Sequence, residues 1–224
     1  MSSEETVADQ RSERRAAIGK AVAARLSRKE AAERVESDRV EMFYRLGFLS
    51  DAECAALIMM IDAGRQPSTL FDANDHAGYR TSESCNLDRW DPLVEAIDRR
   101  ICALMGMKAR QGETLQGQRY AVGQLFKPHH DYFHIDQPYW PEQRKSGGQR
   151  SWTAMIFLNE PEAGGETGFP NAGISVEPRT GMLLAWNNMA ADGSPNIATL
   201  HEGTPVEAGV KYIVTKWFRE RNWM

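Results

Sequence analysis

The sequence predicts a mainly β fold with flanking helices, in which a double-stranded β-helix, or jelly roll, forms the core. The first observation is a series of short β-type runs from Leu115 to the C-terminus, separated by Gly, Pro and Asn turns. The clearest runs are TAMIFLN, GMLLAW and VKYIVTKWF. The second observation is that no GxGxxG follows a strand, as it would in a nucleotide-binding parallel sheet. Many short strands with such turns favour two packed antiparallel sheets.

Two helices are predicted upstream of these strands, and both carry signals at their ends. Ser50 followed by Glu53 fits a capping box, and the helix that it opens is expected to end near residue 64. A second helix is expected to begin at Asp91 and Pro92 and to stop at Gly106. The apolar residues are Ala55, Leu57, Ile58 and Ile61 in the first helix and Leu93, Val94, Ile97, Ile101 and Leu104 in the second. Both helices are therefore expected to back a sheet.

Residues 1–38 are predicted to form a charged N-terminal arm, followed by one domain over residues 39–224. The arm is rich in Ala, Arg, Lys and Glu, and its first dozen residues are expected to be disordered. Ile18, Val22 and Leu26 recur at four-residue spacing, which predicts a helix with one narrow apolar stripe. The favoured interpretation is a solvated helix that packs loosely on the domain. The alternative is a dimerisation or partner-binding arm.

The composition argues against several classes of protein. The chain has 224 residues and a formal net charge of -4, so it can bury one sizeable core and shows no basic character for nucleic acid. Cys54, Cys85 and Cys102 form no CxxC pair, which indicates neither a disulfide framework nor a cysteine zinc site. No apolar run approaches the roughly 18 residues of a membrane span, and the N-terminus is charged. A cytoplasmic protein without a membrane partner is expected, of unknown oligomeric state.

A candidate metal site lies in the stretch RYAVGQLFKPHHD, where His129 and Asp131 are separated by one residue. In a β-strand this spacing points both side chains to the same face, so two metal ligands can converge there. His134 and Asp136 form a second HxD pair, which spacing alone does not reject but which leads into a proline-containing loop. A third ligand must come from elsewhere, and His201 is the candidate.

Two histidines and one carboxylate on one face of a metal are the ligand set of non-haem Fe(II) oxygenases. Of the three positions left open, two can hold a chelating 2-oxo acid and the last can hold O2. A co-substrate such as 2-oxoglutarate also carries a distal carboxylate, and a buried anion needs a cation partner. Lys211, which follows His201 in the sequence, is placed to be that partner.

The strand that contains Lys211 has two different faces. A turn over residues 203–209 is expected to fold this strand back beside His201. One face carries Lys211, Ile213, Thr215, Trp217 and Arg219, and the other carries Val210, Tyr212, Val214 and Phe218. The first face is expected to line the barrel interior, with the co-substrate deep inside and the substrate near the mouth.

Five motifs follow one another between Gly47 and Glu220. They are GFLSDAEC, RTSESCNL, RYAVGQLFKPHHDYFH, GGQRSWTAMIFLNEPEAGGETGFPNAG and LHEGTPVEAGVKYIVTKWFRE. In this order they resemble the 2-oxoglutarate and Fe(II)-dependent dioxygenases of the prolyl 4-hydroxylase type. An isolated HxD is a weak signal, whereas this set in this order is specific.

The resemblance implies Fe(II), 2-oxoglutarate and O2 as cofactors, with ascorbate as an additional candidate, and the release of succinate and CO2. It favours the first HxD pair over the second, because Tyr120 falls where the family has a co-substrate tyrosine. It implies that His129, Asp131 and His201 hold iron. It also implies that Lys211 pairs with the 5-carboxylate of 2-oxoglutarate and that Tyr120 hydrogen-bonds in the co-substrate region.

The resemblance further implies a substrate, which is C4 of a proline in a peptide or protein. Five residues match positions in the family's substrate groove, namely Arg80, Ser82, Glu113, Arg150 and Trp217. Two residues depart from the family, because Phe126 stands where peptide-acting members commonly have tyrosine and Arg219 where some relatives have histidine. Both departures concern the substrate and not the iron chemistry. A free amino acid or small metabolite is therefore an alternative substrate, and a non-catalytic iron- or peptide-binding module is an alternative of another class.

Other residues are expected to have structural roles or to border the substrate. His130 should point away from the metal, and His134 should lie in a loop near the substrate entrance. His76 belongs to no constellation and is expected to be structural or exposed. Thr153 is expected in the barrel wall, and residues 162–173 as a glycine-rich structural turn.

Overall fold

Two antiparallel sheets form the centre of this computed structural model, which describes residues 10–28, 31–69 and 78–223. The large sheet has the order β1 (Glu33–Arg34), β2 (Met42–Arg45), β11 (Leu183–Asn187), β7 (Arg150–Phe157), β14 (Lys211–Arg219), β5 (Gln116–Tyr120), β4 (Glu83–Asn86) and β3 (Gln66–Pro67). The small sheet has the order β10 (Ile174–Val176), β9 (Thr167–Phe169), β12 (His201–Gly203) and β6 (Phe126–His129). A separate short pair consists of β13 (Val206–Ala208) and β8 (Ala163–Gly164).

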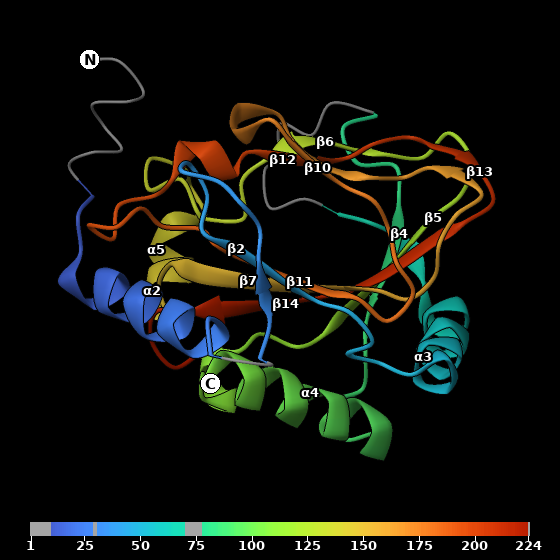
Figure 1. Cartoon of the computed structure of the whole chain (residues 1–224), viewed down its shortest axis with the longest axis horizontal. Helices are drawn as coiled ribbons and strands as arrows, with labels where there is room; N and C mark the ends of the chain where they lie inside the picture. Colours follow the sequence, from blue (N-terminus) through green and yellow to red (C-terminus); the bar gives the residue numbers. More distant parts are fainter. Residues whose placement is uncertain (1–9, 29–30, 70–77, 224) are drawn as a thin grey trace.

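Helices cover the face of the large sheet that is turned away from the small sheet (Figure 1). They are α2 (Glu13–Leu26), α3 (Asp51–Gly64) and α4 (Pro92–Met105), and a short α5 (Trp140–Lys145) precedes β7. Single 3-10 turns occur at Ala109–Gln111, Pro170–Ala172 and Ile197–Thr199. Within the described part of the chain, no helix is both long enough and apolar enough to cross a membrane.

The helix ends agree with the signals in the sequence. Ser50 and Glu53 form both halves of the capping box that opens α3. The carboxylate of Asp91 accepts hydrogen bonds from two backbone N–H groups in the first turn of α4. Gly106 ends that helix with φ at 68°, in the left-handed region that favours glycine. The two predicted helices are thus confirmed.

Alternation along the central strands separates two layers of core. In β7, Ile156 packs beneath the helices and Phe157 faces the small sheet, and both are 0% exposed. In β14, Val214 and Ile213 divide between the same two layers. Two sheets with a common interior and a helical outer layer are the predicted jelly roll with backing helices.

The helix α2 is packed more firmly than the apolar stripe alone suggested. Val22 and Leu26 are 2% and 0% exposed and belong to the core beneath α3 and α4. Near the start of the helix, Arg15 donates to the carbonyl of Gly193 at 2.6 Å and pairs with Glu220 at 3.3 Å. The disorder expected for the first dozen residues falls mainly outside the described residues, and the boundary at residue 38 stays a prediction.

The C-terminal strand differs from the prediction in its neighbours. The strand β12 pairs with β6 and β9, whereas β14 pairs with β5 and β7, so β14 does not fold back beside His201. The chain crosses from the small sheet to the large one between them, because the nine-residue β14 finds longer partners in β5 and β7 than in the three-residue β12. His201 and Lys211 therefore lie in different sheets and face a shared interior.

Candidate active site

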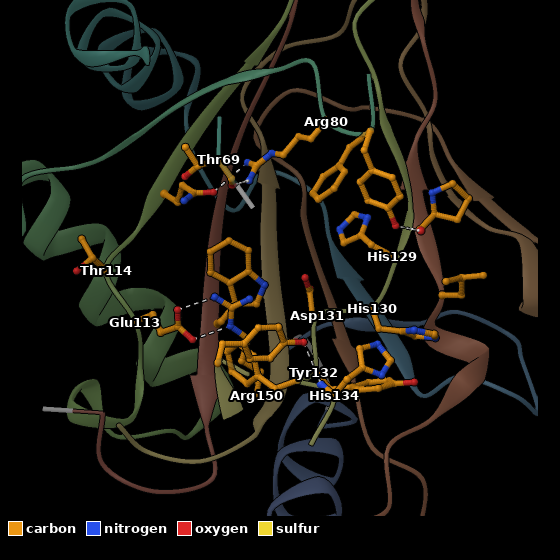
Figure 2. A pocket seen from close by; sticks show the side chains of 18 of the residues that line it. Thr69, Arg80, Glu113, Thr114, His129, His130, Asp131, Tyr132, His134 and Arg150 are labelled. Atoms are coloured by element: carbon orange, nitrogen blue, oxygen red, sulfur yellow. Dashed lines mark hydrogen bonds and ion pairs between the residues drawn. The ribbon is translucent and has the colours of Figure 1, made fainter. Parts of the chain in front are cut away.

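A pocket of about 730 Å³ opens on one side of the space between the sheets (Figure 2). Strands, the loop after β6 and the segment before β5 all contribute to its wall. His129 and Asp131 lie in its floor, and they also line a second, smaller cavity of about 40 Å³ that lies deeper. The two cavities thus meet at these two side chains and at Phe126 and Trp217, which also line both.

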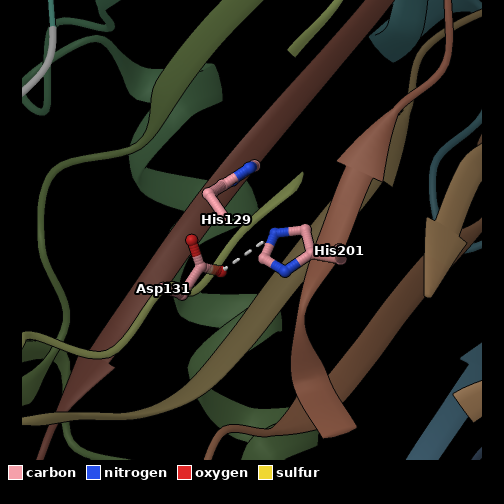
Figure 3. Close-up of side chains that lie close together, drawn as sticks. All are labelled: His129, Asp131 and His201. Atoms are coloured by element: carbon pink, nitrogen blue, oxygen red, sulfur yellow. Dashed lines mark ion pairs between the residues drawn. The ribbon is translucent and has the colours of Figure 1, made fainter. Parts of the chain in front are cut away.

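Three potential metal ligands converge at this junction. β6 ends at His129, Asp131 follows just beyond it, and His201 opens β12 with its Cα paired to that of His129. Their ligand atoms all lie within 4.8 Å of one another, and His201 Nε2 is 3.7 Å from Asp131 Oδ2 (Figure 3). Because Asp131 lies outside the strand, its orientation depends on the loop after β6 and not on the alternation of one strand.

A backbone carbonyl fixes each imidazole. His129 Nδ1 lies 2.8 Å from the carbonyl oxygen of Lys127, and His201 Nδ1 lies 2.9 Å from that of Thr199. With Nδ1 donating these bonds, Nε2 of each ring is left as the neutral acceptor that can bind a metal. Burial, reinforced by the neighbouring His201, holds the pKa of His129 well below its usual range. His129 is therefore ready to ligate near neutral pH without losing a proton.

The carboxylate of Asp131 is held by two residues that sequence spacing does not identify. Thr153 Oγ1 donates to Asp131 Oδ2 at 2.7 Å, and Asn188 Nδ2 donates to Thr153 Oγ1 at 2.9 Å. Thr153 and Asn188 are 0% exposed. Thr153 lies in the barrel wall as expected, but its hydroxyl group also contacts a candidate metal ligand.

The deeper cavity contains one buried cation and several polar groups. Lys211 and Tyr120, which pair across β14 and β5, both line it. Burial lowers the pKa of Lys211 to about 7, an effect that the charge of Glu166 opposes only in part. The hydroxyl of Tyr120 donates to Gln118 at 2.7 Å. Thr167 lines the same cavity, and its buried hydroxyl has no hydrogen-bond partner within the described structure.

These groups fit a 2-oxo dicarboxylate beside a ferrous ion. A buried lysine and an unpartnered hydroxyl offer a positive charge and a donor for the distal carboxylate. The two imidazoles and one carboxylate match the donor set of a non-haem Fe(II) centre and leave positions for the 2-oxo acid and O2. The sequence does not predict a role for Thr167, because it indicates a structural turn over residues 162–173. The structure has the strands β8 and β9 there, and Thr167 is the first residue of β9.

Most residues predicted for the substrate groove lie around the larger pocket. Those that line it are Arg80, Glu113, Arg150 and Trp217. Ser82 is 2% exposed and lies behind the wall, where its hydroxyl accepts a hydrogen bond from Arg80 Nε at 3.1 Å. The structure thus brings four of the five residues to the pocket and places Ser82 as a support for Arg80.

The carboxylate of Glu113 is already paired within the protein. Its two oxygens accept hydrogen bonds of 2.7 Å from Nε and Nη2 of Arg150 (Figure 2). Arg219 Nε donates to one of them as well. Burial alone would raise the pKa of Glu113, but the charges of Arg150 and Arg219 outweigh it and hold that pKa below its usual value. The guanidinium of Arg150 also lies 4.1 Å from the ring centre of Trp217. Glu113 thereby positions Arg150 over the indole.

Phe126 forms a layered contact with the candidate metal site. Its ring stacks on His129 with the centroids 3.5 Å apart and the planes at 15°. The guanidinium of Arg80 lies 4.8 Å from the centroid of Phe126. Phe126, which departs from the family pattern, therefore lies between Arg80 of the larger pocket and the candidate iron ligand His129.

His130 and His134 do not belong to the group of three candidate metal ligands. His130 stacks on Tyr132 with centroids 4.5 Å apart, and both line the larger pocket together with His134. Asp136 of the second HxD pair is exposed. Within the described residues, the potential metal ligands that cluster are His129, Asp131 and His201, and they do not include Asp136. His76 lies outside the described residues.

Comparison with known proteins identifies the family. The sequence model of the 2OG-Fe(II) oxygenase superfamily matches residues 115–219. The chain is 34% identical to prolyl 4-hydroxylase 1 of Arabidopsis thaliana over 194 residues, which cover 78% of this chain and 67% of that protein. This chain belongs to the 2OG-Fe(II) oxygenase superfamily. Its members are dioxygenases that use Fe(II), 2-oxoglutarate and O2, in agreement with the cavity beside the three ligands.

Two further relatives of this oxygenase support the assignment. It is 37% identical to the rat prolyl 4-hydroxylase subunit alpha-1 over 147 residues, which cover 65% of this chain and 27% of that subunit. Its fold matches that of the viral collagen prolyl hydroxylase of Paramecium Bursaria Chlorella virus-1 in complex with 2OG. The TM-score is 0.62 at 26% identity, over 80% of this chain and 94% of the viral one. The chain thus spans about two thirds of the plant relative and a much smaller part of the rat subunit.

Proposed function

We propose that this oxygenase hydroxylates C4 of proline within a peptide or protein and couples this to the conversion of 2-oxoglutarate and O2 into succinate and CO2. The observation that carries the proposal is the pocket of about 730 Å³ that leads directly to the candidate iron ligands. A free amino acid would fill only part of it, whereas an extended chain can reach its whole wall. The similarity to plant, animal and viral prolyl hydroxylases supports the same substrate class.

The protein's own residues would provide ligation, co-substrate binding and exclusion of water. His129, Asp131 and His201 would hold the ion, and Lys211 with Thr167 would bind the distal carboxylate of 2-oxoglutarate. Bound Fe(II) would supply the oxidative decarboxylation of the co-substrate and the insertion of oxygen into a C–H bond. The protein's contribution is therefore to direct this chemistry at one carbon of the substrate.

Aromatic rings in the larger pocket suit a proline-containing segment. Tyr132, Phe133, Tyr139 and Trp217 all line it. A flat aromatic surface packs well against a pyrrolidine ring, and extended proline-containing segments bind such surfaces at a low entropic cost. Arg80 and Arg150 add positive charge at the wall.

The substrate class is tested with peptides that contain proline and with the same peptides carrying alanine instead. The proline peptides should gain the mass of one oxygen atom in step with succinate release, and the alanine peptides should not. If free L-proline is hydroxylated as efficiently as any peptide, the substrate is a small metabolite. If 2-oxoglutarate binds and no substrate releases succinate, the protein is a binding module.

Arginine variants test the pocket itself. Arg80→Ala should raise the apparent KM for a proline peptide by about 10- to 150-fold, since a charged hydrogen bond contributes on the order of 1.5 to 3 kcal/mol. Substrate-free decarboxylation of 2-oxoglutarate should stay nearly intact, because the ligands and Lys211 are unchanged. Arg179→Ala is the matched control, since Arg179 pairs with Glu160 and Glu177 and does not line the pocket. An unchanged KM in Arg80→Ala would argue against a role of Arg80 in peptide binding.

We also propose a cytoplasmic location and ascorbate as an additional cofactor. The three cysteines are free thiols, which supports a reducing, cytoplasmic location that cell fractionation tests. Ascorbate remains a candidate additional cofactor. Its role is tested by comparing the number of turnovers with and without ascorbate before the enzyme loses activity.

A further inference from the structure

We propose that Thr153 and Asn188 are positioning residues that orient the carboxylate of Asp131 to bind the metal through one oxygen. Neither residue would touch the metal or the substrate. The inference rests on the proposed role of His129, Asp131 and His201 as metal ligands. Its test is chosen so that the two can fail separately.

The two residues form a hydrogen-bond relay that ends on the carboxylate. Asn188 Nδ2 donates to Thr153 Oγ1 at 2.9 Å, and Thr153 Oγ1 donates to Asp131 Oδ2 at 2.7 Å. Both donors are 0% exposed, and Asp131 is 6% exposed. In such a dry site a hydrogen bond that ends on an ionised carboxylate is worth more than one between neutral groups.

The direction of the relay is fixed by the single proton of the Thr153 hydroxyl group. That proton goes to the carboxylate of Asp131, which is the stronger acceptor. The hydroxyl oxygen can then only accept from Asn188, so the amide must present its nitrogen and not its oxygen. The backbone of Asn188 is also fixed, because its N–H donates to the carbonyl of Ser151 at 2.9 Å and its carbonyl accepts from the N–H of Asn196 at 3.0 Å. These two bonds hold the Asn188 backbone in place, with its side-chain amide beside Thr153.

The location of the relay explains why Asp131 needs it. His129 and His201 lie on paired strands, whereas Asp131 follows the end of β6 in a loop. Thr153 lies in the middle of β7, and Asn188 comes directly after β11, which pairs with β7. The relay thus connects the loop ligand to the most regular part of the large sheet.

The relay also has a consequence for the number of open metal positions. The bond from Thr153 takes up one of the two lone pairs of Oδ2 and limits rotation of the carboxylate group, so Oδ1 keeps the greater capacity for a metal. Ligation through one oxygen uses one position and leaves three for the 2-oxo acid and O2, whereas ligation through both would leave two. Asn188 and Thr153 would in this way preserve the space that the reaction needs.

The test uses the full chain and Mn(II) as a probe, without O2 and without substrate. Thr153→Val keeps the shape of the side chain and removes the hydroxyl group, and Thr153→Ser keeps the hydroxyl group. Asn188→Ala removes the second donor. Ser151→Ala is the matched control, because Ser151 is also 0% exposed on β7, and its hydroxyl donates to the carbonyl of Phe218 and not to the site. Each variant is titrated with Mn(II), then with 2-oxoglutarate, and its metal-free thermal unfolding is recorded.

Thr153→Val should weaken Mn(II) binding by about 10- to 100-fold, as removal of a group that orients a metal ligand typically does. Thr153→Ser should restore most of the affinity, and Asn188→Ala should lose less than Thr153→Val. Ser151→Ala should bind Mn(II) as wild type does. A purely structural role would lower the unfolding temperature of the metal-free protein and leave the Mn(II) affinity unchanged.

Three outcomes would overturn the relay. One is wild-type Mn(II) affinity in Thr153→Val while Asp131→Ala has lost it, and another is an equal loss in Ser151→Ala. If Thr153→Val does not fold, Asn188→Ala decides, and wild-type Mn(II) and 2-oxoglutarate affinities in that variant would reject the relay. If Asp131→Ala itself binds Mn(II) normally, the metal lies elsewhere, and the proposed function fails before the relay is reached.

Discussion

The two cavities of this oxygenase differ in how far their polar groups are already satisfied. In the deeper one, Lys211 is buried with a lowered pKa, and the hydroxyl of Thr167 has no partner. Around the larger one, Glu113 is already paired with Arg150 and Arg219. The deeper cavity therefore keeps charge and hydrogen-bonding capacity for a small anion. In the larger pocket Glu113 is neutralised internally, and aromatic rings form part of the wall.

The largest expected effect concerns the ligands that the two cavities share. Asp131→Ala should abolish iron binding and succinate release while the fold remains, because two imidazoles alone hold a labile ferrous ion poorly against water. Asp136→Ala, at an exposed position, is the control and should behave as wild type. Iron titration and succinate assays measure both variants. The reverse result would place the metal at the second HxD pair.

The next effect should be confined to the deeper cavity. Lys211→Ala should weaken 2-oxoglutarate binding by a few hundred-fold to a few thousand-fold, since breaking a buried ion pair costs about 3 to 5 kcal/mol. Lys211→Arg should restore this only in part, because the forked guanidinium is larger than an ammonium group. Calorimetric titration with 2-oxoglutarate and, separately, with Mn(II) should show that metal affinity is preserved. An unchanged affinity for 2-oxoglutarate would contradict the role of Lys211.

The lowered pKa of Lys211 predicts a pH dependence of co-substrate binding. In the free protein this amine has a pKa of about 7, so it is charged below pH 7 and increasingly neutral above it. A bound carboxylate raises that pKa, so binding above pH 7 requires uptake of a proton. The dissociation constant of 2-oxoglutarate should therefore rise by up to about tenfold per pH unit above pH 7. Lys211→Ala should lack this slope, and the same slope in that variant would assign the proton to another group.

The smallest expected effect concerns Phe126, which lines both cavities. Phe126→Tyr adds a hydroxyl group to the ring that stacks on His129 and lies beneath Arg80. One new hydrogen bond contributes about 0.5 to 1.5 kcal/mol, so the KM for a short proline peptide should fall by a few-fold. Substrate-free decarboxylation should not change. A large change in 2-oxoglutarate affinity would show that position 126 acts mainly in the deeper cavity.

Sequence patterns were sufficient where the structure is regular and local. The caps at Ser50 and Gly106 act within one turn of a helix, so the sequence predicts both helix ends. The alternation of β14 likewise predicts that Lys211 and Trp217 share the interior face, and both line the deeper cavity. These features depend only on residues close together in the chain.

Features that depend on the register between distant strands were not predictable in the same way. Thr153 reaches Asn188 because β7 pairs with β11, and no local pattern fixes that register. Glu113 was expected to face the substrate, but its pairing with Arg150 depends on a contact between segments far apart in the sequence. The loop that carries Asp131 back to the imidazoles is a third case, since the strand ends before it. In each case tertiary structure decides what the side chain contacts.

The position of β14 has a consequence for the stability of the protein. This strand carries Lys211, pairs with β5 and β7 on its two sides and is buried on most of its length. Its amide groups should therefore exchange with solvent mainly when the whole molecule unfolds. A 2-oxo acid bound at Lys211 stabilises that folded state by mass action, so it should slow hydrogen exchange throughout the sheet and not only near the cavity. Occupancy of the co-substrate site should consequently protect the protein against proteolysis at sites remote from the metal.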